Sequence, residues 1–351
     1  MGNRANYVLI EGEQPTIYFS RWGALTIPAV LLSGPDATIS YVRSLTPDDE
    51  LLDEVWAEGG MVLDVDQCKL KFFGGGRIEV TPYLRRPLLR ALSIVWAGWT
   101  VEWALFGVAE LALSVGWDVG RVLDSERDDR LLLRWAGPDA MDKVVQVAQD
   151  PKQASSIITI RRSDEHVYDH LLVTPSVSAL SFGPRLLDFL DDRPSATLPS
   201  EDDPDLPREG AYLDVTAHTL WMWECSSCNP RYMEAIRRRW PSWQVHAHTE
   251  GLVRQVELSG RDASAVMVSD EQGINQLVEE LMSERTTDPP AIHAALIRRV
   301  PLVLPNEGPI TFGKGFFSAD GPQLSPEERR EVLLRLLHIT LDDENSAQRR
   351  E

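Results

Sequence analysis

The sequence predicts an α+β fold made of two tandem antiparallel hairpin-helix modules, followed by a helical C-terminal extension. Strand-forming residues flank Gly/Pro turns, which is typical of hairpins. The run Gly60–Val65 (Gly-Met-Val-Leu-Asp-Val) returns 150 residues later as Gly210–Val215 (Gly-Ala-Tyr-Leu-Asp-Val). Trp96-x-x-Trp99-x-Val101 likewise returns as Trp240-x-x-Trp243-x-Val245. These repeats indicate an internal duplication, with modules at 1–150 and 151–265 and an extension at 266–351.

The first module contains two strand pairs separated by helices. Pro35 follows Gly34 and suits the first turn of a helix, where its missing N–H costs nothing. Leu88, Leu89 and Leu92 form one apolar stripe, which predicts a helix. In order, we expect a hairpin at 7–19, helices at 27–33, 36–45 and 46–56, a hairpin at 61–73, a helix at 87–96, a strand at 99–105 and a short helix at 107–116.

The second module repeats this order with one replacement. A Pro-rich, acidic linker at 198–210 stands where the first module has the segment 46–60. Weaker matches are Ile17-Tyr18 with Val167-Tyr168, Gly34-Pro35 with Gly183-Pro184, and Gly107 with Gly251. In order, we expect hairpins at 157–168 and 211–224, then a helix at 231–240. The alternative is that hairpin-helix units resemble one another in any α+β protein.

The remaining residues lack a counterpart in the modules. Ser325-Pro326-Glu327-Glu328 is a capping box with Pro at the first helical position. It predicts a helix that runs to about residue 339. We also expect helices at 272–284 and 291–298 and a strand at 310–317.

Composition and charge exclude several classes of protein. The chain has 351 residues, 43% hydrophobic and 25% charged, which are ordinary values for a globular protein. Its formal net charge of −19 argues against nucleic-acid binding and against an anionic membrane surface. The charge suits a basic protein partner, although solubility alone would also explain it. No apolar run reaches 18 residues, and three cysteines are too few for a disulfide framework, so we expect a cytoplasmic protein.

Cys225-Ser226-Ser227-Cys228 is the strongest chemical motif. Two cysteines at this spacing supply half of a tetrahedral zinc site. His246 and His248, two apart on a predicted strand, would present both imidazoles on one face and complete it. The first module has no counterpart of these four residues. The alternatives are a redox pair, or reduced thiols beside the helix that begins at Asn229-Pro230.

Other candidate motifs lack a catalytic pattern. Asp64, Asp66 and Asp214 suggest a carboxylate pair, but their repetition favours a structural role at a strand end. Gly74-Gly75-Gly76 and Gly313-Lys314-Gly315 do not continue as phosphate-binding loops and are typical of turns. We therefore expect that the chain is not an enzyme.

Three segments together resemble a group of uncharacterised bacterial proteins. They are the opening Met1-Gly2-Asn3-Arg4-Ala5-Asn6, the Trp56–Gly60 turn with Asp64 and Asp66 behind it, and Phe72-Phe73-Gly74. The resemblance covers mainly the first hundred residues and carries no activity. It implies a bacterial cytoplasmic protein.

The function these observations favour is a non-enzymatic interaction protein, in one version an inhibitor or immunity-type protein that masks a basic partner. The alternatives are a zinc- or small-molecule-binding protein or enzyme with a site between the modules, and a homo-oligomeric structural subunit. The search for a site turns to places where the modules differ: Cys225–Cys228, His246, His248, Gly74–Pro82 and the C-terminal extension.

Overall fold

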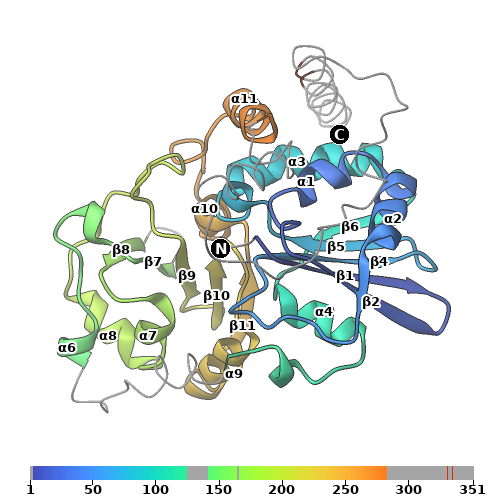
Figure 1. The fold of residues 1–351 in the computed structure, drawn as a ribbon. Coiled ribbons are helices and arrows are strands. Elements are labelled where there is room, and N and C mark those ends of the chain that lie inside the picture. Colours follow the sequence, from blue (N-terminus) through green and yellow to red (C-terminus); the bar gives the residue numbers. More distant parts are fainter. Residues whose placement is uncertain (1–2, 125–140, 164–165, 283–329, 331–333, 335–351) are drawn as a thin grey trace, which may run out of the picture. The chain divides into compact units, whose positions relative to one another are not determined.

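The computed structural model describes residues 3–124, 141–163, 166–282, 330 and 334. The chain divides into two compact units, of which one holds Met1–Leu123 and Asp270–Glu351 and the other holds Asp124–Ser269. Each unit contains one β-sheet with helices packed against it (Figure 1). The protein is therefore a mixed α+β protein with two sheets.

The first unit is built on a six-stranded sheet in the order β3-β2-β1-β4-β5-β6. Hairpins β1–β2 and β4–β5 are antiparallel, whereas β1–β4 and β5–β6 are parallel. The sheet is thus mixed, because helices connect the two hairpins and carry the chain to β6. The strands are β1 (Ala5–Glu11), β2 (Gln14–Ser20), β3 (Thr46–Asp48), β4 (Gly59–Asp64), β5 (Lys69–Phe73) and β6 (Thr100–Trp103).

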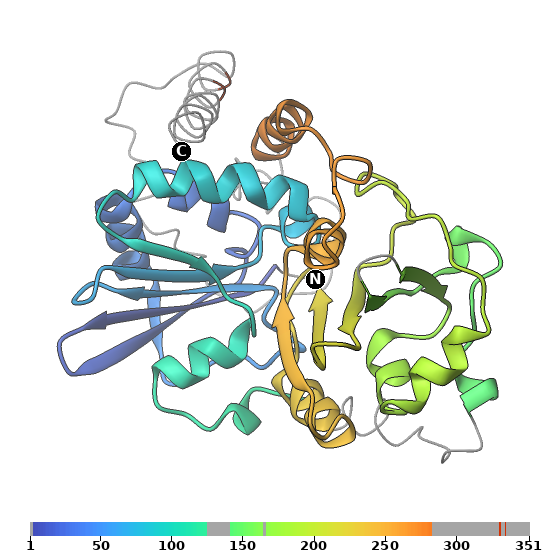
Figure 2. The ribbon, with the colours of Figure 1, turned by 180° about the vertical axis from the view of Figure 1, so that it is seen from behind.

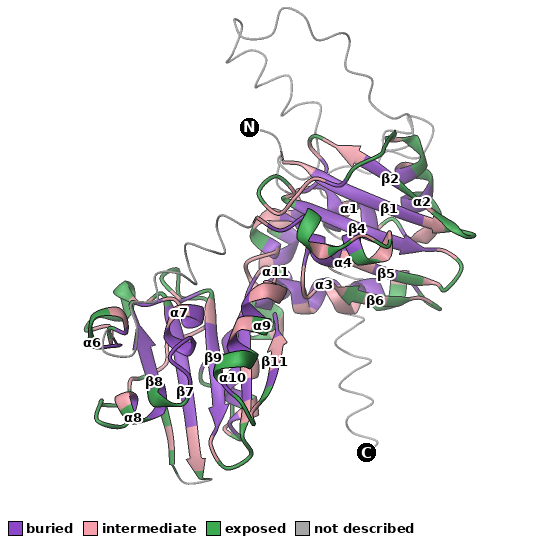
Figure 3. Cartoon of the chain, turned by 90° about the horizontal axis from the view of Figure 1, so that it is seen from below, coloured by how far each residue is buried: buried purple, intermediate pink, exposed green. Residues whose placement is uncertain are grey.

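Helices cover both faces of this sheet, and Figure 2 shows α3 running along one of them. Strand residues such as Val8 and Val62 pack against α4, and the intervening residues face the other side. Figure 3 shows the central strands buried. The helices of this unit are α1 (Ile27–Leu31), α2 (Pro35–Ser44), α3 (Pro82–Val95), α4 (Val108–Ser114) and α11 (Asp270–Leu281), with 3₁₀ turns at Gly76–Ile78 and Val119–Arg121.

Helix α11 packs on α3 of the first unit. Pro87 interrupts the hydrogen bonding of α3, because proline cannot donate to the carbonyl of Tyr83 four residues earlier. Gly273 of α11 approaches that carbonyl so closely that a Cβ would lie 2.9 Å from its oxygen. Arg90 also bonds Asp270 at 3.1 Å. The sequence predicts this helix but assigns it to a separate extension, whereas the structure groups it with the first unit.

The second unit has a five-stranded sheet in the order β11-β10-β9-β7-β8. Hairpins β7–β8 and β9–β10 are antiparallel, and β7–β9 and β10–β11 are parallel. This order and these directions match those of β6-β5-β4-β1-β2 in the first sheet. The strands are β7 (Ser156–Ser163), β8 (His166–Leu172), β9 (Glu209–Asp214), β10 (Thr219–Glu224) and β11 (Gln244–His248).

The helices of the second unit follow the strands in a comparable order. Helix α10 covers an apolar cluster on one face of the sheet, which includes Ile157, Trp223 and Leu252. Helix α7 packs against α9 and against strands β7 and β9. The helices are α6 (Met141–Val144), α7 (Ser176–Leu180), α8 (Arg185–Asp191), α9 (Pro230–Arg239) and α10 (Gly251–Leu258), with a 3₁₀ turn at Pro151–Gln153.

The predicted helix at 46–56 is wrong. Residues 46–48 form β3, which pairs with β2, and turns follow. The acidic residues after Pro47 are typical of a helix start, but here the segment meets the sheet edge, and tertiary pairing overrides local preference. The predicted elements at 291–298 and 310–317 lie outside the described residues, and of the predicted helix at 325–339 only Arg330 and Leu334 are described, both as helical. Within the described part of the chain, no helix is long and apolar enough to cross a membrane.

Candidate functional site

Cys225 and Cys228 lie between the end of β10 and the start of α9. Their exposed fractions are 3% and 2%, and neither takes part in a disulfide. Asn229 caps α9 by accepting a hydrogen bond from the Arg231 backbone at 2.8 Å, with Pro230 at the first turn. The pair therefore stands beside a helix start, as its sequence position indicates.

His246 and His248 lie on β11, with both side chains on one sheet face. Parallel pairing sets His246 beside Trp221 and His248 beside Trp223. The His246 ring stacks on Trp221 with centroids 4.4 Å apart and planes at 23°. His248 is 6% exposed, and its backbone carbonyl accepts a bond from Cys228 Sγ at 3.5 Å. The structure thus brings Cys228 to the His248 backbone and engages His246 with an aromatic ring.

The four residues predicted to bind zinc are all in the second unit. Across residues 3–124, 141–163 and 166–282, no three His, Cys, Asp or Glu side chains are grouped so that they could hold one metal ion. The zinc site stays a prediction, which metal analysis of the purified protein would check.

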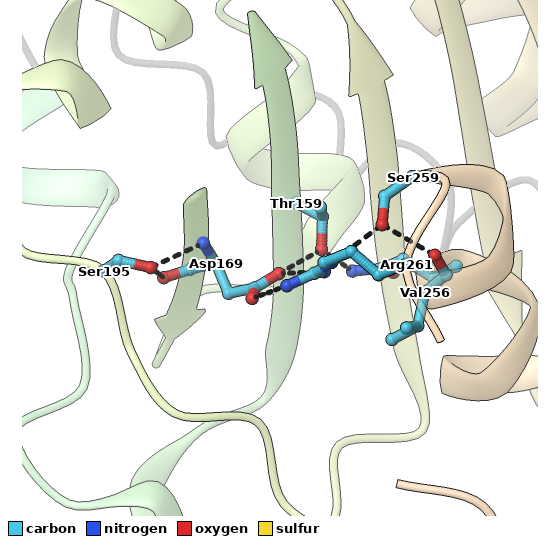
Figure 4. A network of polar contacts seen from close by, with 7 residues as sticks. Thr159, Asp169, Ser195, Val256, Ser259 and Arg261 are labelled. Carbon is cyan, nitrogen blue, oxygen red and sulfur yellow. Dashed lines mark hydrogen bonds and ion pairs between the residues drawn. The ribbon is translucent and has the colours of Figure 1, made fainter. Parts of the chain in front are cut away.

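A buried polar network lies beneath α10 (Figure 4). Asp169 of β8 is 4% exposed and binds both terminal nitrogens of Arg261, at 2.6 and 2.9 Å. Thr159 of β7 donates to Asp169 at 2.6 Å and accepts from Gln255 at 2.6 Å. Gln255 in turn accepts from the Trp223 indole. Each carboxylate oxygen thus has a donor, so the network joins three strands to α10 and the segment after it.

No motif in the sequence indicates this network. Asp169 stands before His170-Leu171-Leu172, and a carboxylate in a buried strand requires a cation. The need for a cation near the Asp169 carboxylate could indicate the network, but that cation is Arg261, which lies 92 residues further along the chain. No local pattern pairs residues at that separation.

The repeated aspartates form turns. Asp64 accepts from the Gln67 backbone at 2.9 Å, and Asp214 accepts from the Ala217 backbone at 2.8 Å. Asp66 accepts from the Gly12 backbone at 2.7 Å. Asp214 also accepts from Tyr212 at 3.1 Å and pairs with Arg161 at 3.3 Å. These contacts favour the structural interpretation of the Leu-Asp-Val repeat.

Segment 46–58 of the first unit is anchored by hydrogen bonds to its backbone. The buried amide of Asn6 donates to the Leu52 carbonyl at 2.9 Å and accepts from the Leu52 N–H at 3.0 Å. Glu54 N–H donates to the Val122 carbonyl at 2.8 Å, and Leu51 is buried in the α4 core. The segment is therefore preorganised at the edge of the sheet.

The same segment presents apolar and acidic side chains to solvent. Val55 is 53% exposed and Trp56 is 51% exposed. In the described part of the chain, Asp48, Asp49 and Glu50 are exposed and have no ion-pair partner. Segment 46–58 contains six acidic residues, at positions 48, 49, 50, 53, 54 and 58. We call it the acidic edge segment.

Glu79 follows the glycine run in the loop 74–82. Gly74, Gly75 and Gly76 all have positive φ, and a Cβ at Gly75 would lie 2.6 Å from the Pro28 ring. The pKa of Glu79 is raised to about 7: burial is the main cause, the positive charge of Arg85 opposes the rise, and the negative charge of Glu58 adds to it. Arg85 donates to the Glu79 carbonyl at 2.9 Å and lies over the Trp103 ring at 4.4 Å. The sequence shows that this loop differs between the modules, but it does not indicate the raised pKa of the Glu79 carboxyl.

Comparison with known proteins gives no relative: no protein-family model, curated protein or solved structure matches the chain.

Proposed function

We propose that this chain is a non-enzymatic interaction protein that binds a basic protein partner through its acidic edge segment. The carrying observation is that a segment anchored by backbone hydrogen bonds displays Val55 and Trp56 to solvent among acidic residues. Exposed aromatic residues are frequent anchors of protein interfaces. The surrounding negative charge favours encounter with a positively charged partner. An inhibitor or immunity-type protein in a reducing, cytoplasmic setting is the concrete form of this proposal.

The ordered backbone of the acidic edge segment also supports a role in binding. A loop that must be ordered on binding loses affinity to the cost of ordering it. Two hydrogen bonds between the Asn6 amide and the Leu52 backbone, and one from Glu54 N–H to the Val122 carbonyl, hold this backbone in place without a partner. The Asp53 carboxylate also accepts from the backbones of Val55 and Trp56, at 3.0 and 3.2 Å. The exposed pair is thus held on an ordered turn.

Neutralising the acidic edge segment should weaken partner binding. We expect the triple variant Asp48→Asn, Asp49→Asn and Glu50→Gln to bind a basic partner at least about tenfold more weakly at low salt, because three attractive charges are lost. The measurement is affinity purification from the cells that naturally make the chain, followed by titration of the recovered protein.

The second unit supplies a matched control. Asp202, Asp203 and Asp205 are also exposed and acidic, with Asp205 lying 3.8 Å from the Lys152 ammonium. Their triple Asn variant changes the net charge by the same amount. We expect this control to retain binding. Equal loss in both variants would show that only the overall charge matters, and recovery of no stoichiometric partner at low salt would contradict the proposal itself.

We also propose that the two units arose by internal duplication. Beyond the shared strand order, Trp96 donates to the Leu31 carbonyl at 2.7 Å and Trp240 donates to the Leu180 carbonyl at 2.7 Å. The following tryptophan packs edge-on in each unit, with centroids 5.0 and 4.8 Å apart. Cys68 and His218 have φ of 51° and 52° in corresponding hairpin turns. Residues shared at this level of detail are what common descent would leave.

The strand register refines one sequence match. Val8 pairs with Ile17 and Val62, and Thr159 pairs with Asp169 and Tyr212. With Gly60 matched to Gly210, Ile17 therefore corresponds to Asp169, not to Val167. The polar network of the second unit thus occupies positions that are apolar in the first.

The duplication predicts equal effects at its two buried tryptophans. Both Trp96 and Trp240 are fully buried, so Trp96→Phe and Trp240→Phe each remove one indole hydrogen bond and leave a cavity. The Leu31 and Leu180 carbonyls keep the bonds that they accept from the Gly34 and Gly183 N–H groups. We expect each variant to lower the free energy of unfolding by about 1–3 kcal/mol, from the lost hydrogen bond and the cavity together. Chemical denaturation of both variants checks this; a large cost at one position and none at the other would indicate unrelated roles.

The alternative function is a zinc- or small-molecule-binding protein that uses the second unit. The stacked Trp221 and His246 rings, both partly exposed, are the observation that favours it. Spectroscopic titration of His246 with zinc ions would test it, and an unchanged imidazole signal would count against it.

A further inference from the structure

The Trp56 ring already carries a guanidinium from its own chain. Arg4 Cζ lies 4.5 Å from the ring centroid, which is within the range of a cation–π contact. The tryptophan is 51% exposed. The contact therefore shows which kind of group this ring accepts at the surface of the acidic edge segment.

The position of Arg4 does not depend on its side chain. Its N–H donates to the Glu58 carboxylate at 3.0 Å, and its carbonyl accepts from the Glu58 N–H at 2.9 Å. Both bonds use the Arg4 backbone, so they persist when the guanidinium leaves Trp56. The guanidinium can thus be exchanged without breaking the entry into β1.

The other tryptophan cation–π contacts of the first unit differ from this one. Arg85, which lies over the Trp103 ring, is only 3% exposed and donates to the Glu79 carbonyl. A partner therefore cannot reach the Arg85 guanidinium. Arg121 lies 3.7 Å from the Trp117 centroid, but Trp117 is only partly exposed and is outside the acidic edge segment. Of the three tryptophans Trp56, Trp103 and Trp117, it is Trp56 that combines an exposed ring with neighbouring acidic and apolar side chains.

We propose that Trp56 is an arginine-binding position, and that an arginine of the basic partner displaces Arg4 from the ring when the partner binds. The inference rests on the proposed function and identifies the contact within the same surface. Arginine is favoured over lysine because the planar, weakly hydrated guanidinium stacks on an aromatic face better than an ammonium does. The neighbouring acidic side chains attract the partner's further cations.

Displacement makes an unusual prediction about Arg4. If its guanidinium competes for the ring, then Arg4→Ala should tighten binding of an arginine-rich ligand. The probe is a fluorescein-labelled nona-arginine peptide, followed by fluorescence anisotropy at two salt concentrations, with nona-lysine as the second peptide. We expect Arg4→Ala to tighten nona-arginine binding about two- to fivefold, the range to which a surface cation–π contact corresponds. Nona-lysine should gain less.

Two controls separate competition from simple loss of positive charge. Arg121→Ala removes the same charge from another tryptophan of the first unit and should change affinity less than Arg4→Ala does. In the Trp56→Leu background, Arg4→Ala should no longer tighten binding. A gain that is equal in Arg121→Ala, or that persists without Trp56, would overturn the displacement.

The experiment also distinguishes this inference from the proposed function. If nona-arginine binds the wild type and the triple variant Asp48→Asn, Asp49→Asn, Glu50→Gln equally, the acidic edge segment is not the binding surface and both proposals fail. If the triple variant weakens binding while Arg4→Ala has no effect, the surface stands and only the displacement of Arg4 is refuted.

Discussion

Replacing Arg261 with methionine should lower the free energy of unfolding of the second unit by about 2–4 kcal/mol. The change leaves the buried Asp169 carboxylate without its cation, and breaking one half of a buried pair is costly. The Arg261 side chain is 33% exposed and that of Asp169 is 6% exposed, so water compensates for part of the loss. Urea denaturation followed by tryptophan fluorescence measures the effect.

A surface ion pair gives the matched control. Arg238 bonds Glu234 at 3.1 Å on α9, and its side chain is 74% exposed. We expect Arg238→Met to cost less than about 0.5 kcal/mol, because exposed pairs of this kind contribute little. Similar costs for the two variants would contradict the view that burial of Asp169 decides the energetics.

The first unit suggests a rescue of the lost network. Its corresponding positions carry Val8, Ile17 and Leu111, all in the apolar core. Combining Asp169→Ile, Thr159→Val and Gln255→Leu in the Arg261→Met background should recover part of the stability, provided that Trp223→Phe also removes the indole N–H that Gln255 accepts. The first unit has Phe73 at that position, and well-packed apolar residues often replace a buried ion pair without loss. A combined variant that is less stable than Arg261→Met alone would show that the second unit requires its polar core.

Glu79→Gln should change how the stability of the first unit depends on pH. The folded protein holds the Glu79 proton more tightly than the unfolded chain does, because its pKa rises from 4.5 to about 7. Stability contributed by this group is therefore complete below pH 4.5 and is lost as the pH rises through 7. The glutamine variant lacks this loss. At pH 8 we expect it to be more stable than the wild type by about 2 kcal/mol, allowing for the partial exposure of Glu79.

The check is denaturation at several pH values from 4.5 to 8. Glu58→Gln is the companion variant: Glu58 contributes to the raised pKa of Glu79, so its removal should reduce the pH dependence without abolishing it. A Glu79→Gln profile parallel to that of the wild type would show that Glu79 does not titrate in this range.

The periodic and repeated parts of the sequence predict the fold most successfully. The sequence predicts the hairpins β1–β2 and β4–β5, because strand-forming residues flank turn residues within a few positions. The helices α2 and α9 follow Pro and Asn signals that act locally. The apolar stripe predicts α3, but the helix begins at Pro82 and not at the predicted residue 87. The predicted antiparallel pairing does not extend to β1–β4 and β5–β6, which join distant segments in parallel.

Local signals fail where the segment 46–58 meets the sheet. Its acidic start is typical of a helix, yet β2 and the Asn6 amide hold it in an extended and turned form. The exposure of Val55 and Trp56 follows from that placement. No sequence pattern could indicate it, because exposure depends on where the neighbouring elements end.

The sequence by itself determined the two similar sets of strands, the turn-forming role of Asp64 and Asp214, and the acidity that suggests a basic partner. These depend on residue type and on spacing along the chain. Only the tertiary structure decided that Asp169 meets Arg261, that the pKa of Glu79 is raised, and that Arg4 lies on Trp56. These depend on burial and on contacts between residues far apart in sequence, which the packing of each unit creates.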